Sequence, residues 1–258
     1  MRPSIEFLYQ TLRGLNWNCE GMCRYRPDIA APDHPERSYV PALPPELLND
    51  VLPATRAAIL EDLPEIMDIQ DPGLREKVIA AWALSLRDSS FSRIRDIPGE
   101  GAPNHFVLRQ GTQEMHLRGV AHLAMGIVDE FTRNFPHAPV DRDIVLAGAL
   151  CHDIGKCWEC DPVNQERWRS RPDKVGYPSM RHSVYGAHIC LAAGLPEAIA
   201  HIALGHSMEG AHIALSTECT IVRWADNSWW YSAAALGLCE PGTLAAAGSM
   251  MSPRPAAA

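Results

Sequence analysis

A histidine and an aspartate, His152 and Asp153, stand side by side where an apolar stretch of small residues ends. The stretch reads Ala-Gly-Ala-Leu-Cys over positions 147–151, and Gly155 and Lys156 follow the pair. Burying an imidazole and a carboxylate without partners is costly, and a metal ion would supply the missing partner. The dipeptide alone fits equally well with a helix C-terminus, in which His152 lies near the negative dipole end and Gly155 caps the helix.

Four further segments with helical periodicity each carry a polar residue on their apolar face. In segment 112–133, His116 shares its face with the apolar residues Val120, Leu123, Ala124, Ile127, Val128 and Phe131. In segments 179–193, 196–206 and 216–235, the corresponding inward residues are His182, His206 and Asp226. The histidines that lie off these faces are His122, His188 and His201. One inward histidine is commonly a core residue, but five converging sets indicate a metal site.

The order of these residues resembles the H…HD…H…H…D pattern of the HD-domain superfamily, in the subset whose six ligands bind two metals. The sequence His-Leu-Arg-Gly-Val-Ala-His-Leu-Ala from residue 116 resembles the first helix of that superfamily. His-Ser-Val-Tyr-Gly-Ala from residue 182 and Gly-Leu-Pro-Glu from residue 194 resemble its middle section. The resemblance covers about residues 112–232. It implies an all-α fold, namely an HD-domain helical bundle.

The resemblance also implies how the ligands divide. Asp153 would bridge two metal ions, and the other ligands would form two groups, His116 with His152 and Asp226, and His182 with His206. Imidazole and carboxylate ligands suit several transition metals. We therefore expect two divalent ions of iron, manganese or zinc.

Residues for catalysis and substrate binding are predicted beside these ligands. Lys156 follows the His-Asp pair where relatives carry a substrate-anchoring lysine, although a solvated charge at a helix end is the alternative. Arg118, Arg181 and Arg223 are near ligands in the sequence and could bind an anion, although surface arginine is the commoner outcome. Trp229 shares the face of Asp226 and could form a pocket wall.

Two activities fit this pattern, both on a small-molecule substrate. The first is a phosphohydrolase acting on a small phosphoester or nucleotide, with Asp153 and Lys156 as catalytic residues and a metal-activated hydroxide. The alternative is a mixed-valent di-iron oxygenase that cleaves a C–C or C–P bond, similar to myo-inositol oxygenase. The complete ligand set disfavours a regulatory module without turnover. No Gly-Tyr-Pro sequence follows His182, the third histidine of the pattern, which disfavours a cyclic-dinucleotide phosphodiesterase.

We divide the chain into an N-terminal helical and proline-rich extension at 1–111, an HD domain with a dinuclear site at 112–239, and a disordered tail at 240–258. In the extension, residues 50–69 are predicted to be helical with a break at Pro64. The Asp71-Pro72 pair predicts the start of the next helix.

Two segments are predicted to be irregular. Residues 91–111 are rich in glycine and proline and indicate a loop, and no strand of useful length is expected anywhere. Residues 161–178 carry Pro162, Pro172, Gly176 and Pro178, which predicts a long connection lying over the metal site as a lid.

Composition narrows the class of protein. The chain has 258 residues and a net charge of −8, so it lacks the basic face expected of a nucleic-acid-binding protein. We find no signal-peptide pattern and no apolar run that could span a membrane. The eight scattered cysteines favour a reducing cytoplasm. Cys157 and Cys160 could form a zinc site with Cys19 and Cys23, but reduced thiols near the site mouth are the favoured interpretation. The sequence leaves the oligomeric state open.

Overall fold

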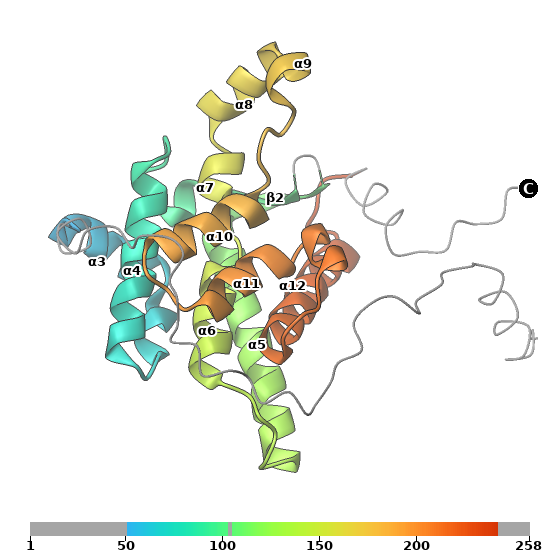
Figure 1. Cartoon of the computed structure of the whole chain (residues 1–258). Coiled ribbons are helices and arrows are strands. Elements are labelled where there is room, and N and C mark those ends of the chain that lie inside the picture. The colour runs from blue at the N-terminus through green and yellow to red at the C-terminus, as the bar shows by residue number, and fades with distance from the viewer. Residues whose placement is uncertain (1–50, 103–104, 242–258) are drawn as a thin grey trace, which may run out of the picture. The chain divides into compact units, whose positions relative to one another are not determined.

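The computed structural model describes residues 51–102 and 105–241. These residues are mainly helical, which confirms the predicted all-α class (Figure 1). The Cys19 and Cys23 pair, residues 1–50 of the predicted extension and nearly all of the predicted tail lie outside this part. Within it, no helix has the length and hydropathy that a membrane crossing requires.

The first described helices follow the sequence signals closely. Helix α3 covers Pro53–Asp62, and a short 3-10 helix, η2, covers Pro64–Asp68, so the predicted break falls at Pro64. Helix α4 covers Pro72–Arg87. Its N-cap is Asp71, whose side chain accepts a hydrogen bond of 2.7 Å from the backbone N–H of Gly73. The aspartate satisfies one of the unpaired donors at the helix start, as the sequence predicted.

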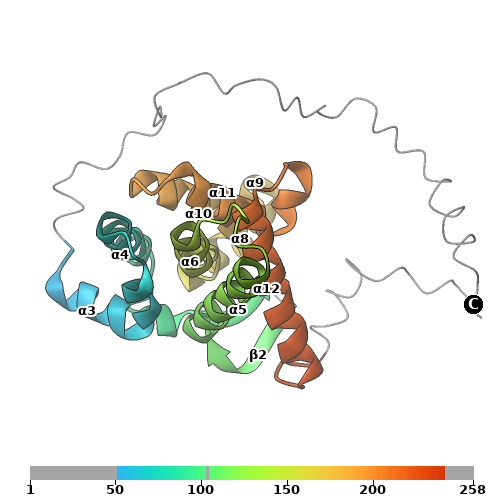
Figure 2. The same cartoon turned by 90° about the horizontal axis from the view of Figure 1, so that it is seen from below.

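The helices that carry or adjoin the candidate ligands are α5 (Gln113–Asn134), α6 (Arg142–Cys151), α7 (Lys156–Glu159), α10 (His182–Ala192), α11 (Glu197–Gly205), the 3-10 helix η4 (Met208–His212) and α12 (Thr217–Ala235). Among them, α6 is apolar and central. Helix α6 packs against α4, α5, α11 and α12, and Figure 2 shows it enclosed between them. Every residue of α6 from Val145 to Cys151 is buried, because this helix is apolar on all sides.

Helices α3 and α4, which belong to the predicted extension, share one hydrophobic core with the helices that carry the candidate ligands. The indole N–H of Trp82 on α4 donates to the Leu150 carbonyl at 3.1 Å. The Ser85 hydroxyl donates to the Ile154 carbonyl at 2.8 Å. Both acceptors flank the His-Asp pair, so α4 fixes the backbone at the end of α6 from its outer side.

The prediction that residues 91–111 form a loop is wrong. After the 3-10 helix η3 (Ile94–Asp96), strands β1 (Pro98–Ala102) and β2 (His105–Thr112) pair as an antiparallel hairpin. A Cβ atom on Gly99 would lie 3.2 Å from the Gly111 carbonyl oxygen, so this glycine permits close approach of the two strands. The backbone after α12 also pairs with β2, at Leu108 and Cys239.

The predicted lid is also wrong. Residues 161–178 contain helices α8 (Pro162–Ser170) and α9 (Pro172–Val175), which project away from the other helices at the top of Figure 1. Asp161 caps α8 by accepting from the backbone N–H groups of Val163 and Asn164. This Asp-Pro helix start is the same signal as at Asp71.

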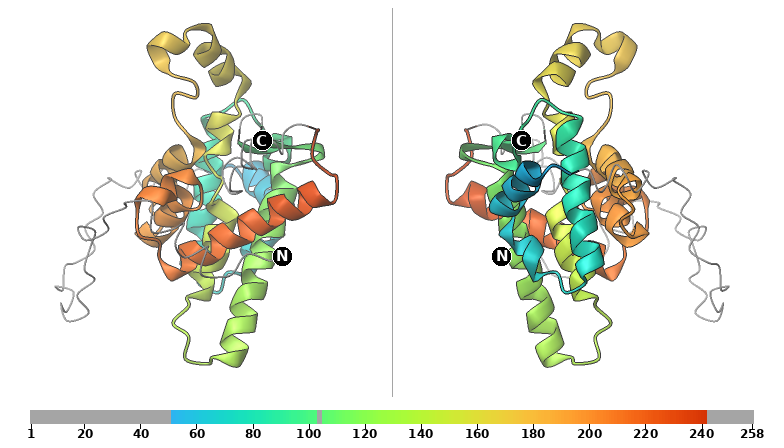
Figure 3. Two further views of the ribbon diagram at one scale, coloured as in Figure 1. Left: turned by 90° about the vertical axis from the view of Figure 1, so that its right-hand side faces the viewer. Right: turned by 90° about the vertical axis from the view of Figure 1, so that its left-hand side faces the viewer.

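The apolar face predicted for α5 is buried only in part. Val120, Ala124 and Val128 are buried, whereas Leu123 and Phe131 are exposed. The C-terminal turns of α5 extend beyond the neighbouring helices, as Figure 3 shows, so they have no partner there to cover the outer part of the face.

The turn after the His-Asp pair approaches α10 so closely that only glycine fits at position 155. A Cβ atom there would overlap the carbonyl oxygen of His182. Gly155→Ala should therefore lower the free energy of unfolding by roughly 1–3 kcal/mol, because backbone must move. The control is Gly126→Ala on α5, where a Cβ atom meets nothing within 4 Å. Urea unfolding should show Gly126→Ala to be more stable than the parent chain by about 0.5–1 kcal/mol. Equal changes in the free energy of unfolding for the two variants would contradict the close contact at Gly155.

Candidate metal centre

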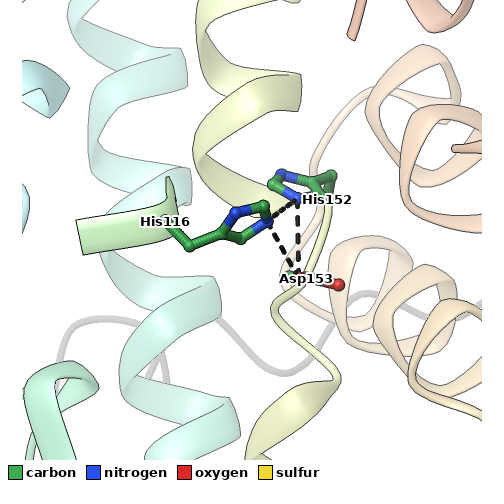
Figure 4. Close-up of side chains that lie close together, drawn as sticks. All are labelled: His116, His152 and Asp153. Carbon is green, nitrogen blue, oxygen red and sulfur yellow. Dashed lines mark hydrogen bonds and ion pairs between the residues drawn. The ribbon is translucent and has the colours of Figure 1, made fainter. Parts of the chain in front are cut away.

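Five helices or helix ends bring the candidate ligands to one buried point. His116 comes from α5, His152 and Asp153 follow α6, and the others are His182 at the start of α10, His206 after α11 and Asp226 on α12. The four imidazoles and Asp153 are almost completely buried. Figure 4 shows His116, His152 and Asp153 pointing toward one another. The facial pattern in the sequence therefore corresponds to one cluster of side chains.

The carboxylate of Asp153 presents a different oxygen to each half of this cluster. Its Oδ2 atom lies 3.4 Å from Nε2 of His116 and 3.6 Å from Nε2 of His152. Its Oδ1 atom lies 3.2 Å from Nε2 of His182 and 3.3 Å from Nε2 of His206. Asp226 lies on the first side, with its Oδ1 atom 3.3 Å from Nε2 of His116.

Backbone carbonyl groups orient two of the histidines. Nδ1 of His152 lies 2.7 Å from the Ala149 carbonyl oxygen, and Nδ1 of His206 lies 2.9 Å from that of Ala203. Each acceptor is three residues earlier, in the last turn of the helix that precedes the histidine. These contacts leave Nε2 of both rings facing the centre, which is the arrangement that a metal-binding histidine needs.

Glu159 orients a third histidine, and the sequence analysis did not find it. This carboxylate is completely buried at the end of α7, where it accepts a hydrogen bond from Nδ1 of His182. Arg181 donates to its other oxygen at 2.5 Å. Burial opposes ionisation of Glu159, but the charges of His182, Lys156 and Arg181 outweigh it and lower the pKa of Glu159 to about 2. The sequence did offer a signal for this residue, because a glutamate three residues after Lys156 lies one helical turn away on the same face.

Gln113 is a second polar residue that the sequence analysis missed. It is completely buried in the first turn of α5, and its side-chain amide donates to Oδ2 of Asp153 at 2.6 Å. It lies three residues before His116, so the helical spacing places both on the same side of α5.

Burial and charge act in opposite directions on the protonation of the cluster. Burial lowers the pKa of His152 to about 4, which leaves the ring neutral and able to donate a lone pair. Burial opposes protonation of His116 as well, but the nearby carboxylates of Asp153 and Asp226 outweigh it and raise the pKa of His116. Burial likewise opposes ionisation of Asp153, but the charge of Lys156 and the surrounding histidines hold the pKa of Asp153 well below its ordinary value.

Several polar atoms of the cluster lack hydrogen-bond partners. They include Oδ1 of Asp153 and Oδ1 of Asp226, both buried from solvent. Buried carboxylate oxygens without donors are costly, and a cation would satisfy them. The candidate ligands form three overlapping groups of three residues. Within each group the ligand atoms lie within 4.8 Å of one another, so each group could hold a metal ion. Imidazole nitrogens with carboxylate oxygens are a donor set suited to divalent transition metals, so these residues fit such an ion.

The sequence model of the HD domain matches residues 114–228, which include all of the candidate ligands. This segment is an HD domain. The match confirms the resemblance drawn from the order of histidines and aspartates. Searches of the curated proteins and of the solved structures gave no match for the chain.

A cavity of about 650 Å³ opens onto the ligands of the HD domain. Its lining includes Asp153, Asp226, His182 and His206, and Arg181 and Arg223 also line it. Arg181 is paired with Glu159 and with Glu209. Arg223 donates to the Gly205 carbonyl at 3.3 Å, and no carboxylate pairs with it among the described residues.

Other residues predicted to bind substrate lie elsewhere. Arg118 is outside the cavity and pairs with Glu65 and Glu114. Trp229 packs edge-on against His116, with ring centroids 4.7 Å apart, but it does not line the cavity. The next residue, Trp230, does.

Lys156 is neither a solvated charge nor part of the cavity lining. It is completely buried, and its Nζ atom donates to the backbone carbonyls of Glu100 and Gly101 at 2.7 and 2.6 Å. Burial opposes its charge, but Asp153 and the neighbouring acidic groups raise the pKa of Lys156. The lysine therefore connects the ligand cluster to the β1–β2 hairpin.

The thiols of Cys157 and Cys160 are free and buried, rather than placed at the mouth of the site. Cys160 donates to the Glu100 carboxylate at 3.3 Å. Burial raises the pKa of Cys157 to about 12, so this thiol stays protonated at neutral pH.

Asp153→Ala should abolish binding of Mn²⁺ or Zn²⁺, because Asp153 faces all four imidazoles. The matched controls are His122→Ala, His188→Ala and His201→Ala. His122 and His188 are exposed, and His201 accepts from the backbone N–H of Ser216 instead. Elemental analysis after reconstitution checks this. The variant His152→Ala should also lose its metal. If any control variant lost metal as completely as His152→Ala, the inward helical faces would be wrongly assigned.

Glu159→Gln should weaken metal binding about 10- to 100-fold, because the neutral amide orients His182 less well and makes the ring less basic. Competition with a chromogenic chelator measures this dissociation constant. Glu166→Gln on α8 is the control, since Glu166 is exposed and pairs with Arg169 on the surface. Equal affinities of both variants and the parent would assign Glu159 a purely structural role.

Proposed function

We propose that the chain is a metal-dependent hydrolase that releases phosphate from a small phosphoester or nucleotide. The HD domain supports the general class, because this family consists mostly of metal-dependent hydrolases. The phosphoester substrate and the number of metal ions are our inference from the geometry.

One observation carries the proposal, namely the two-sided environment of Asp153. Two imidazoles face each of its oxygens at 3.2–3.6 Å, and Oδ1 of Asp226 lies 3.3 Å from Nε2 of His116. Six inward ligands exceed the number that one tetrahedral site uses. We therefore infer two ions. His116, His152 and Asp226 would hold one, His182 and His206 would hold the other, and Asp153 would serve both.

When bound, divalent ions at these ligands would supply Lewis acidity, which lowers the pKa of water and polarises a phosphoryl oxygen. The residues of the chain hold these groups in place. Asp153 and Asp226 would bring negative charge that offsets the ions, and burial of the four imidazoles limits their contact with bulk water. Glu159 and the carbonyls of Ala149 and Ala203 hold the rings in fixed orientations, so no rearrangement is needed when substrate arrives.

Arginines at the cavity wall favour an anionic substrate. Arg223 faces the cavity without a carboxylate partner in the described part of the chain. A guanidinium binds a phosphate with two parallel hydrogen bonds, which adds both energy and orientation. Arg181 already neutralises Glu159 and Glu209, so we assign phosphate binding to Arg223 first.

The test is to purify the full chain without oxygen, measure its metal content, and assay phosphate release and oxygen consumption on the same sample. We expect two equivalents of metal and release of phosphate from simple phosphomonoesters. Arg223→Met should raise KM for them about tenfold, the effect of one lost charge-assisted hydrogen bond. Its control is Arg142→Met, because Arg142 pairs with Asp129 on the surface.

Iron with oxygen consumption and no phosphate release would instead establish the oxygenase. One equivalent of metal or less would contradict the six-ligand assignment and favour a single site of His116, His152, Asp153 and Asp226.

A further inference from the structure

The cavity has more room than a phosphate group fills. At about 650 Å³ it lies within the range of cavities that enclose a complete small molecule. Among the described residues, Asp153 and Asp226 are the only carboxylates that line it, and both belong to the ligand cluster. The rest of the wall must therefore contact the organic part of the substrate.

Aromatic rings from two distant segments form part of that wall. Phe106 comes from β2, and Trp230 and Tyr231 come from α12. The ring of Phe106 lies 5.7 Å from that of Trp230 and 5.5 Å from that of Tyr231, measured between centroids. Trp230 also packs against the candidate ligand His116 at 4.7 Å, so the rings begin directly beside the ligand cluster.

The backbone at Phe106 is strained. Its φ angle of +50° lies in the left-handed region, which bulky residues rarely adopt and where glycine is the ordinary choice. A bulky ring at such a strained position, lining a cavity beside the candidate ligands, points to a role in binding rather than in forming the turn.

Lys156 holds the hairpin that presents this ring. Its Nζ atom binds the carbonyls of Glu100 and Gly101. Gly101 packs against both rings, since a Cβ atom there would lie 3.4 Å from atoms of Phe106 and of Trp230. The rings are thus fixed before substrate binds, which reduces the entropy lost on binding.

We propose that Phe106, Trp230 and Tyr231 form a subsite for a planar aromatic ring, so that the preferred substrate is a phosphoester whose alcohol carries such a ring. The proposal rests on the proposed function for the phosphate half of the substrate. The preference for an aromatic ring in the alcohol part rests only on the three aromatic residues of the cavity wall.

Hydrolysis of benzyl phosphate and of ethyl phosphate by the metal-reconstituted full chain tests the subsite, because both leave as primary alcohols. We expect kcat/KM to be roughly 10- to 100-fold higher for benzyl phosphate, the factor that burial of one ring provides. Phe106→Gly should reduce this ratio about tenfold, and glycine adopts the backbone conformation at 106 without strain. The control is Phe135→Gly, because Phe135 is exposed at the end of α5. Phe135→Gly should keep the same ratio of kcat/KM for the two esters as the parent chain.

Binding distinguishes failure of the subsite from failure of the proposed hydrolysis. Calorimetry with benzylphosphonate and ethylphosphonate, which are not phosphate esters, needs no turnover. Tighter binding of benzylphosphonate that Phe106→Gly abolishes supports the subsite even if no ester is hydrolysed. Equal affinities for the two phosphonates overturn it, even if both esters are hydrolysed. Equal kcat/KM for benzyl phosphate and cyclohexylmethyl phosphate also overturns it, since a puckered ring cannot stack as a planar one does.

Discussion

The buried negative charge of Asp153 is the constraint on which the rest of the structure depends. Isolated burial of a carboxylate is strongly unfavourable unless charges and donors surround it. Here Gln113 donates to one oxygen, four imidazoles lie around both, and the buried ammonium of Lys156 is close enough to lower its pKa. Helices α5, α6, α10 and α11 meet at this carboxylate because each supplies part of that environment. The same arrangement could hold a metal ion.

Lys156 transmits this constraint to the substrate side of the molecule. A buried ammonium needs acceptors as much as it needs an opposite charge, and the carbonyls of Glu100 and Gly101 supply them. The hairpin therefore lies where the lysine can reach it, and the hairpin is one wall of the cavity. The electrostatics of the ligand cluster and the shape of the cavity thus both depend on one side chain. Relatives are expected to use a lysine at this position on substrate, whereas here its described contacts are with the protein backbone.

Local signals in the sequence were reliable wherever one segment sufficed to explain the structure. The Asp71-Pro72 start of α4 and the break at Pro64 follow from capping and from the missing N–H of proline. The same Asp-Pro signal at residue 161 was overlooked among prolines that suggested a loop. The glycines of β1 and β2 wrongly predicted a loop for a different reason. They permit close backbone contact between two strands, and sequence alone does not separate that use from a flexible turn.

What the sequence by itself determined is the set of metal-competent side chains and the helical faces that carry them, because periodicity within one helix fixes which residues point inward. It also determined the helical class and the HD domain. Only the tertiary structure decided which oxygen of Asp153 faces which histidines, that Glu159 supports His182, and that Trp230 rather than Trp229 lines the cavity. These features depend on how helices far apart in the chain cross one another. Trp229 and Trp230 follow Asp226 by three and four residues, so helical spacing places both beside it and does not choose between them.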